Sequence, residues 1–449
     1  MAAWSPDSWK SRPKAQAIAY DDPAELEAAV RTLRRLPPLV TSWEIEQLKA
    51  QLAQAQRGER FVLQGGDCAE TLDDCAPDSI AAKLKILLQM SMVLIHGGKR
   101  PVTRVGRFAG QYAKPRSKPT EVRDGVELPN YFGDLVNRPD FTARARRADP
   151  QLLVEGYKHA GLTLNFIRSL TKSGFADLHH PEYWDLSFMA SAKLSGALRA
   201  EYQRIVDEVT RALDFMEAVG ERSVAQLSRV EFYTSHEGLN LHYESAQTRT
   251  VPRRRGWYDL STHLPWIGER TRQLDGAHVE FFRGVRNPVG VKLGPSTTPE
   301  EVLRLLDVLN PQDEPGKIVL ITRMGATRAR AALGPIVARV RDEGRPVLWM
   351  SDPMHGNTVS TPSGLKTRDF DAILQELEEV MAVHEEAGTY LGGVHFELTG
   401  DDVTECTGGA QALTAADLER NYTSVCDPRL NYQQALEMSF RIARRMPSR

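Results

Sequence analysis

The segment from residue 289 to residue 350 carries the repeating pattern that decides the fold. It holds three short apolar runs, Val289-Gly-Val-Lys-Leu293, Ile318-Val-Leu-Ile-Thr322 and Val347-Leu-Trp-Met350, and a stretch with helical spacing separates each run from the next. Short β-branched runs of this kind are typical of buried strands. Strands that alternate with helices predict a parallel sheet.

The same unit recurs along most of the chain. Five further runs are found at Phe61–Gln64, Val102–Val105, Val230–Tyr233, His263–Ile267 and Val394–Leu398. Eight strand–helix units in one chain favour an α/β fold of the closed (β/α)8 (TIM) barrel type over an open doubly wound sheet. No GxGxxG motif follows the first run, which weakens the open-sheet alternative.

The chain divides into an arm and one large catalytic domain. We expect residues 1–42 to form an N-terminal arm with a helix at Pro23–Leu36, and residues 43–449 to form the barrel. A helical insertion at about 108–229 follows the second strand. It contains a Pro-rich loop at Pro115–Pro139 and helical patterns at Leu152–Leu170 and Leu194–Val219.

Composition excludes several classes of protein. Lys and Arg number 57 against 59 Asp and Glu, for a net charge of -2, so no basic surface for nucleic acid is implied. The N-terminus lacks the apolar core of a signal peptide, and no later stretch reaches the roughly 18 apolar residues of a membrane span. We therefore expect a cytoplasmic protein. Its four cysteines lack CxxC spacing, which argues against a structural zinc site.

Side-chain alternation places charged residues inside the barrel. Val289, Val291 and Leu293 share one face of their strand, so Lys292 points inward. By the same argument Glu397 points inward from the last strand, and Arg323 continues the inward face of the sixth strand. Active sites of such barrels lie at the C-terminal ends of the strands, where these residues occur.

The barrel end holds more cations than free carboxylates. At least four cations, Arg107, Arg270, Lys292 and Arg323, belong to it. One interpretation is a set of internal ion pairs, because structural networks also bury charge. The alternative is a site for an anionic substrate, since guanidinium groups bind phosphate and carboxylate in a forked geometry.

A second group of residues is suited to bind a metal. Cys68, His355 and Glu397 end the first, seventh and eighth strands, which are neighbours in a closed barrel, and Asp427 follows the last strand. Each alone has a structural explanation, such as a buried thiol or a capping carboxylate. Together they predict a site that zinc, iron, cobalt or manganese would fit by ligand type.

Six segments of the chain resemble the type II (plant-like) 3-deoxy-D-arabino-heptulosonate 7-phosphate (DAHP) synthases. The resemblance covers nearly everything from about residue 43 onward. The segments are Leu63-Gln-Gly-Gly-Asp-Cys-Ala-Glu-Thr71, Arg107-Phe-Ala-Gly-Gln-Tyr-Ala-Lys-Pro-Arg-Ser117, Trp266-Ile-Gly-Glu-Arg-Thr-Arg272, Gly290-Val-Lys-Leu-Gly-Pro295, Asp352-Pro-Met-His-Gly-Asn357 and Cys426-Asp-Pro-Arg-Leu-Asn431.

The resemblance implies a reaction and a set of site residues. The reaction joins phosphoenolpyruvate to erythrose 4-phosphate, at the entry to aromatic biosynthesis. The implied metal is divalent, manganese or alternatively cobalt, and its ligands are Cys68, His355, Glu397 and Asp427. The implied phosphoenolpyruvate residues are Arg107, Trp266, Glu269, Arg270, Lys292 and Arg323. The implied erythrose 4-phosphate residues are Lys114, Arg116, Ser117 and Lys366.

The same resemblance implies catalytic roles and an assembly. Glu269 is expected to face the attacking water or the cationic carbon, and Lys292 to move protons. A homo-oligomer is also implied, although many members carry a longer N-terminal extension that contributes to assembly. Two other readings of the site stay open: a metal-dependent barrel aldolase for another phosphosugar, and a non-catalytic relative that binds aromatic metabolites or a partner enzyme.

Overall fold

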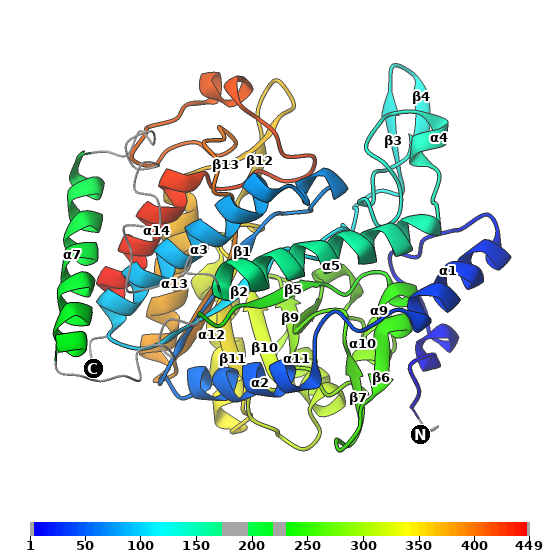
Figure 1. Cartoon of the computed structure of the whole chain (residues 1–449), viewed down its shortest axis with the longest axis horizontal. Coiled ribbons are helices and arrows are strands. Elements are labelled where there is room, and N and C mark those ends of the chain that lie inside the picture. Colours follow the sequence, from blue (N-terminus) through cyan, green and yellow to red (C-terminus); the bar gives the residue numbers. More distant parts are fainter. Residues whose placement is uncertain (1–3, 173–195, 219–229, 447–449) are drawn as a thin grey trace.

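Each of the eight apolar runs forms or adjoins one strand of a closed parallel barrel (Figure 1). The computed structural model describes residues 4–172, 196–218 and 230–446. Strands follow one another around the barrel in sequence order, and the last pairs with the first, which confirms the predicted TIM barrel. They are β1 (Phe61–Gly66), β2 (Val102–Arg107), β5 (Tyr233–Glu237), β8 (Leu264–Ile267), β9 (Val289–Leu293), β10 (Ile318–Thr322), β11 (Leu348–Ser351) and β14 (Leu391–Glu397).

One strand is displaced from its predicted position. The apolar run at Val230–Tyr233 predicted the third strand, but β5 begins only at Tyr233 and continues through polar residues to Glu237. These polar side chains are accommodated by internal hydrogen bonds, since Ser235 Oγ donates to Gly106 O and accepts from Gln64 Nε2. The strand boundary therefore follows pairing with β2 and β8, not hydrophobicity.

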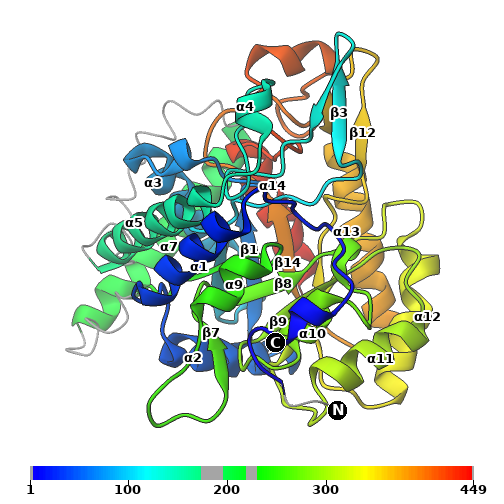
Figure 2. The same ribbon diagram turned by 90° about the vertical axis from the view of Figure 1, so that its right-hand side faces the viewer.

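Helices surround the barrel on its outer face (Figures 1 and 2). Most of them connect successive strands, as the alternating pattern predicted. They are α3 (Pro77–Gly98), α4 (Ala143–Arg146), α5 (Gln151–Lys172), α7 (Gly196–Ala218), α9 (Leu241–Gln247), α10 (Ala277–Phe282), α11 (Pro299–Leu309), α12 (Ala329–Asp342), α13 (Phe370–Glu386) and α14 (Tyr432–Arg445).

Helix α3 passes a length and hydropathy test for a membrane span, contrary to the expectation from sequence. Among the described helices it alone does so, with a mean hydropathy of 1.4. In this structure 67% of the most apolar 18-residue stretch of α3 is buried, and the helix packs against β2, α5 and α14 among others. Burial on this scale is that of a core helix.

The lower end of the barrel is closed by an N-terminal helix. Helix α2 (Ser42–Gln56) begins with a capping box between Thr41 and Glu44 and presents Leu48, Leu52 and Ala55 to the barrel interior. There they pack with a cluster that includes Val62, Val319, Ile321 and Leu348. The N-terminal end of the barrel is thus filled with apolar side chains. Inward charged residues lie at the opposite end.

Several small elements accompany the barrel and its helices. The arm contains the predicted helix, α1 (Pro23–Arg35), which ends before Pro37-Pro38, and also η1 (Ser8–Ser11), which was not predicted. Within the Pro-rich loop lies a hairpin, β3 (Thr120–Arg123) and β4 (Val126–Pro129). A second hairpin follows β11, formed by β12 (Thr358–Ser360) and β13 (Lys366–Arg368). A third, β6 (Thr248–Thr250) and β7 (Trp257–Asp259), precedes β8.

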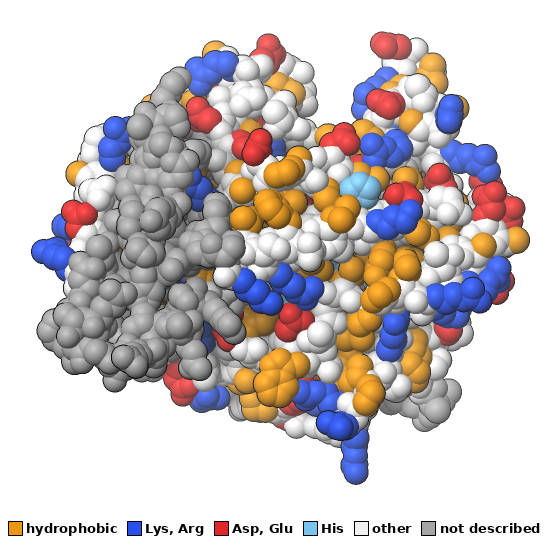
Figure 3. Space-filling view, viewed as in Figure 1, with side chains coloured by type: hydrophobic (Ala, Val, Ile, Leu, Met, Phe, Trp, Pro, Cys, Tyr) orange, Lys and Arg blue, Asp and Glu red, His pale blue; other side chains and the backbone are white. Residues whose placement is uncertain are grey.

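The two hairpins β3–β4 and β12–β13 stand on either side of the open end of the barrel (Figure 1). The space-filling view shows a deep notch beside the β3–β4 projection (Figure 3). Part of the expected insertion, residues 173–195 and 219–229, lies outside the described residues, as do the end residues of the predicted helix Leu194–Val219. The division into arm, barrel and insertion stays a prediction.

Candidate active site

A cavity of about 960 Å³ opens at the C-terminal ends of the strands. It extends up between the β3–β4 hairpin and the loop after β11. Of the residues predicted from sequence, ten line it: Lys114, Arg116, Ser117, Glu269, Arg270, Lys292, Arg323, His355, Lys366 and Asp427. The other four, Cys68, Arg107, Trp266 and Glu397, are buried.

Three potential metal ligands converge at the cavity floor. Ligand atoms of Cys68, Glu397 and Asp427 lie within 4.8 Å of one another. The ammonium group of Lys114 lies beside all three, with its Nζ 2.7 Å from Cys68 Sγ, 2.7 Å from Asp427 Oδ2 and 3.8 Å from Glu397 Oε1. A cationic group already in contact with these donors shows that the cluster attracts positive charge. Its mixture of thiol and carboxylates suits a divalent transition metal.

His355 adjoins this trio and is held in place by Asp352. The His355 Nε2 atom lies 2.9 Å from Glu397 Oε1, and its Nδ1 atom lies 2.8 Å from Asp352 Oδ2. An imidazole whose second nitrogen contacts a carboxylate is the arrangement usual for a histidine ligand. Asp352 also forms an ion pair with Lys292. One carboxylate therefore orients a candidate ligand and a candidate catalytic residue.

The charges of the floor stabilise one another. Burial would raise the pKa of Glu397, but His355, Arg368 and Lys114 hold it well below its ordinary value. Burial likewise opposes the charge of Lys114, yet Asp427, Cys68 and Glu397 raise the pKa of its ammonium well above the usual range. For Cys68, burial and then contact with Cys426 raise the pKa of the thiol. The floor is therefore a set of paired charges, and burial opposes the thiolate form of Cys68 among them.

Arg107 and Trp266 form the layer beneath the cavity. The Arg107 guanidinium donates to Glu397 Oε1 at 3.0 Å and lies 5.2 Å from the Trp266 ring. The Lys292 Nζ atom lies 5.8 Å from the same ring. Burial lowers the pKa of Lys292, although Asp352 opposes this. A lysine with a lowered pKa is suited to proton transfer.

The two interpretations of the excess cations each hold for part of the set. Arg107 and Lys292 are paired with Glu397 and Asp352, as the ion-pair interpretation expected. Arg270 and Arg323 instead make hydrogen bonds to neutral groups, Ser117 Oγ at 2.8 Å and His355 O at 2.7 Å. Those two guanidinium groups keep their charge available to an anion.

Three further residues belong to the site but were not among the predicted site residues. Glu237, at the end of β5, lines the cavity, and burial raises the pKa of its carboxyl group. Asp352 links Lys292 to His355, and Arg368 donates to Glu397 Oε2 at 2.6 Å. Glu237 ends β5 and Asp352 directly follows β11, so their position at strand ends was a usable signal. Arg368 lies in the β12–β13 hairpin, where no pattern pointed to it.

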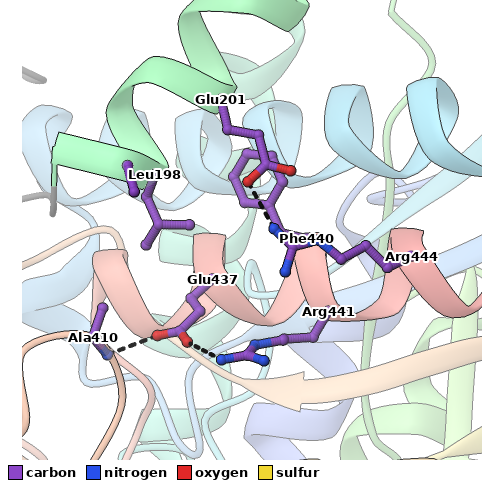
Figure 4. Close-up of a pocket in the computed structure, with 8 residues that line it drawn as sticks. Leu198, Glu201, Ala410, Glu437, Phe440, Arg441 and Arg444 are labelled. Atoms are coloured by element: carbon purple, nitrogen blue, oxygen red, sulfur yellow. Dashed lines mark hydrogen bonds and ion pairs between the residues drawn. The ribbon is translucent and has the colours of Figure 1, made fainter.

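A smaller hollow of about 320 Å³ lies between α7 and α14 (Figure 4). Its charged side chains pair within the lining, Arg444 with Glu201 at 2.8 Å and Arg441 with Glu437 at 3.1 Å. These pairs neutralise the charge that would attract an ionic ligand, in contrast to the main cavity.

Comparison with known proteins identifies the family. The Class-II DAHP synthetase family matches residues 4–443 of the chain. The chain belongs to the class II DAHP synthase family. Three curated relatives named phospho-2-dehydro-3-deoxyheptonate aldolase, the third as AroG, are similar over nearly their whole length. The protein from Neurospora crassa is 47% identical (98% of this chain, 94% of that protein), that from Streptomyces coelicolor 49% (97% and 96%), and that from Mycolicibacterium smegmatis 44% (97% and 93%).

Family membership agrees with the site as the structure builds it. The motifs that carry the resemblance contribute Cys68 and Asp427 of the donor trio, the Lys114–Ser117 loop, Arg270 and Lys292 to the cavity and its floor. Segments distant in sequence therefore meet at the end of the barrel where class II members were expected to bind substrate.

Proposed function

We propose that this protein condenses phosphoenolpyruvate with erythrose 4-phosphate to give DAHP and inorganic phosphate, the first step of the shikimate pathway. One observation carries the proposal: Lys114, Arg116, Arg270, Lys292, Arg323 and Lys366 line a single cavity whose floor holds the donor trio. Two phosphorylated substrates need two anion sites side by side, and this arrangement offers them.

Cys68, His355, Glu397 and Asp427 are the residues that would hold a divalent cation, manganese by family resemblance. Bound there, the cation would polarise the aldehyde carbonyl of erythrose 4-phosphate as a Lewis acid. Thiol, imidazole and carboxylate donors, together with the Asp352 contact to His355, fit this role.

Residues in or just after β8, β9 and β10 are proposed to hold phosphoenolpyruvate, together with Arg107 at the end of β2. Arg270 and Arg323 bind its phosphate and carboxylate, Lys292 adds a third charge, and Arg107 and Trp266 form the wall behind it. The rigid strand ends orient the enol carbon C3 toward the aldehyde. Such positioning and charge stabilisation supply several kcal/mol of barrier reduction in enzymes, roughly 3–4 kcal/mol for one hydrogen-bond donor.

Erythrose 4-phosphate is proposed to lie against Lys114, Arg116, Ser117 and Lys366. The C2=C3 π electrons of phosphoenolpyruvate form the bond from C3 to the aldehyde carbon, which leaves positive charge at C2, while the π bond of the aldehyde breaks and its oxygen gains a proton. Water then adds at C2 and loses a proton, and the C2–O bond to phosphate breaks as the new hydroxyl becomes the C2 carbonyl. Glu269, whose Oε2 atom is buried with no partner among the described side chains, can accept a proton from that water. Lys292 can supply one to the departing or newly formed oxygen.

A two-substrate assay tests the proposal. Phosphate release should require both phosphoenolpyruvate and a four-carbon aldose phosphate, and it should stop after chelation. A barrel aldolase for another phosphosugar would release no phosphate from this pair, and a regulatory relative would turn over neither substrate. Either result would overturn the assignment.

A further inference from the structure

The loop Lys114–Ser117 lines one wall of the cavity, and its backbone has few supports of its own. The Lys114 amide donates to Phe132 O at 2.8 Å, and Pro115 has no N–H to donate. Ser117 is exposed, and its Oγ accepts from Arg270. The guanidinium of the half-buried Arg116 has one long contact, from Nη1 to Cys426 Sγ at 4.0 Å, so the position of the residue depends largely on whatever holds its backbone amide.

That amide is held by the N-terminal arm. The Arg116 N–H donates to Gln16 Oε1 at 2.7 Å, across 100 residues of sequence. Among residues 115–117, no other backbone hydrogen bond exists within the described part of the chain. The contact with Gln16 thus holds the backbone between Lys114 and Lys118, whereas the other contacts of this stretch, Arg116 Nη1 to Cys426 Sγ and Ser117 Oγ to Arg270, are made by side chains.

Gln16 is itself fixed from both sides. Three residues before it, Pro13 O accepts from Ala277 N of α10 at 2.9 Å. Four residues after it, Tyr20 Oη accepts from Asn240 Nδ2, at the start of α9, at 2.9 Å. Gln16 adopts a left-handed backbone with φ of 58°, a conformation that residues with a Cβ avoid unless the surroundings impose it. The turn is thus anchored to the barrel's helices.

Lys114 does not share this dependence. Its amide donates to Phe132 O and its ammonium group contacts Cys68 and Asp427, all of which lie outside the arm in sequence. Of the phosphoenolpyruvate residues, Lys292 pairs with Asp352 and Arg323 donates to His355 O, and Arg270 reaches the loop through the side chain of Ser117, not through the backbone that Gln16 holds. Loss of the Gln16 contact should therefore loosen Arg116 while the donor trio and the phosphoenolpyruvate side stay in place.

We propose that Gln16 is a positioning residue for the acceptor substrate, and that the arm thereby forms an outer part of the erythrose 4-phosphate subsite. The proposal rests on the proposed function for the identity of the substrate. Gln16 contacts no substrate itself. It sets where the Arg116 guanidinium meets the phosphate group of the aldose.

The test compares Gln16→Met, which keeps an unbranched side chain of similar length but loses the acceptor, with Gln16→Glu, which keeps it. For Gln16→Met we expect the KM for erythrose 4-phosphate to rise about five- to tenfold, the effect of one lost hydrogen bond, with the KM for phosphoenolpyruvate nearly unchanged. Hydrogen–deuterium exchange of a peptide that covers residues 113–118 should quicken. Gln16→Glu should restore the protection of that peptide.

The control is Ser11→Ala, which removes a hydrogen bond within the arm, from Ser11 Oγ to Ser8 O, and should change neither KM. Unchanged exchange in Gln16→Met, or equal rises in both KM values with a lower melting temperature, would overturn the proposal. Hydrogen–deuterium exchange needs no turnover, so it tests the arm contact independently of activity. A wild-type protein that makes no DAHP would refute the proposed function and leave the exchange result to decide on the arm contact.

Discussion

At the scale of single residues, Lys114 joins the two halves of the site. It was predicted to bind the aldose phosphate, and its ammonium group lies among the donors predicted to bind a metal. Like charges repel strongly in a buried site, so a cation on Cys68, Glu397 and Asp427 would favour movement of this ammonium toward the substrate. Metal and substrate binding are therefore expected to be coupled through this side chain.

Replacing Lys114 by Met should separate those two roles. The ammonium group of Lys114 competes with a metal for Cys68, Glu397 and Asp427. The Lys114→Met variant should therefore bind manganese at least as tightly as the wild type does. The KM for erythrose 4-phosphate should rise at least tenfold, since a charged hydrogen bond of about 1.5–3 kcal/mol is lost. Calorimetric titration with manganese and steady-state kinetics measure the two effects. Weaker manganese binding would contradict this account of Lys114.

Replacement of Arg270 tests directly whether the cations of the cavity that have no carboxylate partner bind an anionic substrate. Its guanidinium is exposed and bonds only to Ser117 among the described side chains, so Arg270→Ala should leave the melting temperature nearly unchanged. Loss of a phosphate or carboxylate contact should lower kcat/KM for phosphoenolpyruvate by about 100-fold or more, equivalent to roughly 3 kcal/mol. Arg304→Ala, at another exposed arginine, on α11, is the matched control. A destabilised variant with normal kinetics would show that Arg270 serves the fold.

Cys426 immediately precedes the candidate ligand Asp427, and its side chain contacts that of Cys68. Their hydrogen bond lowers the pKa of Cys426. After metal removal, mild hydrogen peroxide should therefore oxidise the two thiols to a disulfide, with two electrons passing to peroxide and water as product. Activity should be lost and recovered with a thiol reductant.

Peptide mapping of the oxidised protein checks that prediction. Cys426→Ser should resist inactivation and keep its activity, whereas Cys75→Ser should behave as the wild type. A Cys68–Cys75 link, or four free thiols, would show that the prediction is wrong.

At the scale of elements, α13 ties two loops of the site together. Glu376 on this helix accepts from Asn357 Nδ2 at 2.7 Å and from Met324 N at 2.6 Å. Met324 follows Arg323, and Asn357 lies two residues after His355. One buried carboxylate thus fixes the loops after β10 and β11 against the same helix.

The ionisation of Glu376 should make stability depend on pH. Burial raises its pKa to about 7, from an ordinary value of 4.5. The folded state therefore favours the protonated carboxyl group. Its contribution to the free energy of unfolding is complete below pH 4.5 and is lost as the pH rises through 7. The loss is on the order of 3 kcal/mol. In Glu376→Gln the melting temperature should change less between pH 5 and pH 8 than it does in the wild type. An identical slope in both proteins would contradict the raised pKa.

At the scale of the whole molecule, the sequence predicts what depends on local repetition. Eight strand–helix units define the barrel, and the alternation of side chains along the strands correctly predicted that Lys292 and Glu397 point inward. Polar β5 was displaced because its side chains are satisfied by partners on other strands, which no local pattern reveals. The Lys292–Asp352 pair and the Gln16–Arg116 contact were also beyond reach, because they join separate segments only after the barrel has closed.

In the protein as a whole, one cavity is proposed to join two phosphorylated substrates above a metal ion. The most direct measurement is the analysis, by mass spectrometry and phosphate assay, of products that the purified protein forms from phosphoenolpyruvate and erythrose 4-phosphate. The account predicts one DAHP for each phosphate released, no product after chelation, and recovery when manganese is added. Phosphate release without a seven-carbon product, or full activity after verified metal removal, would contradict it.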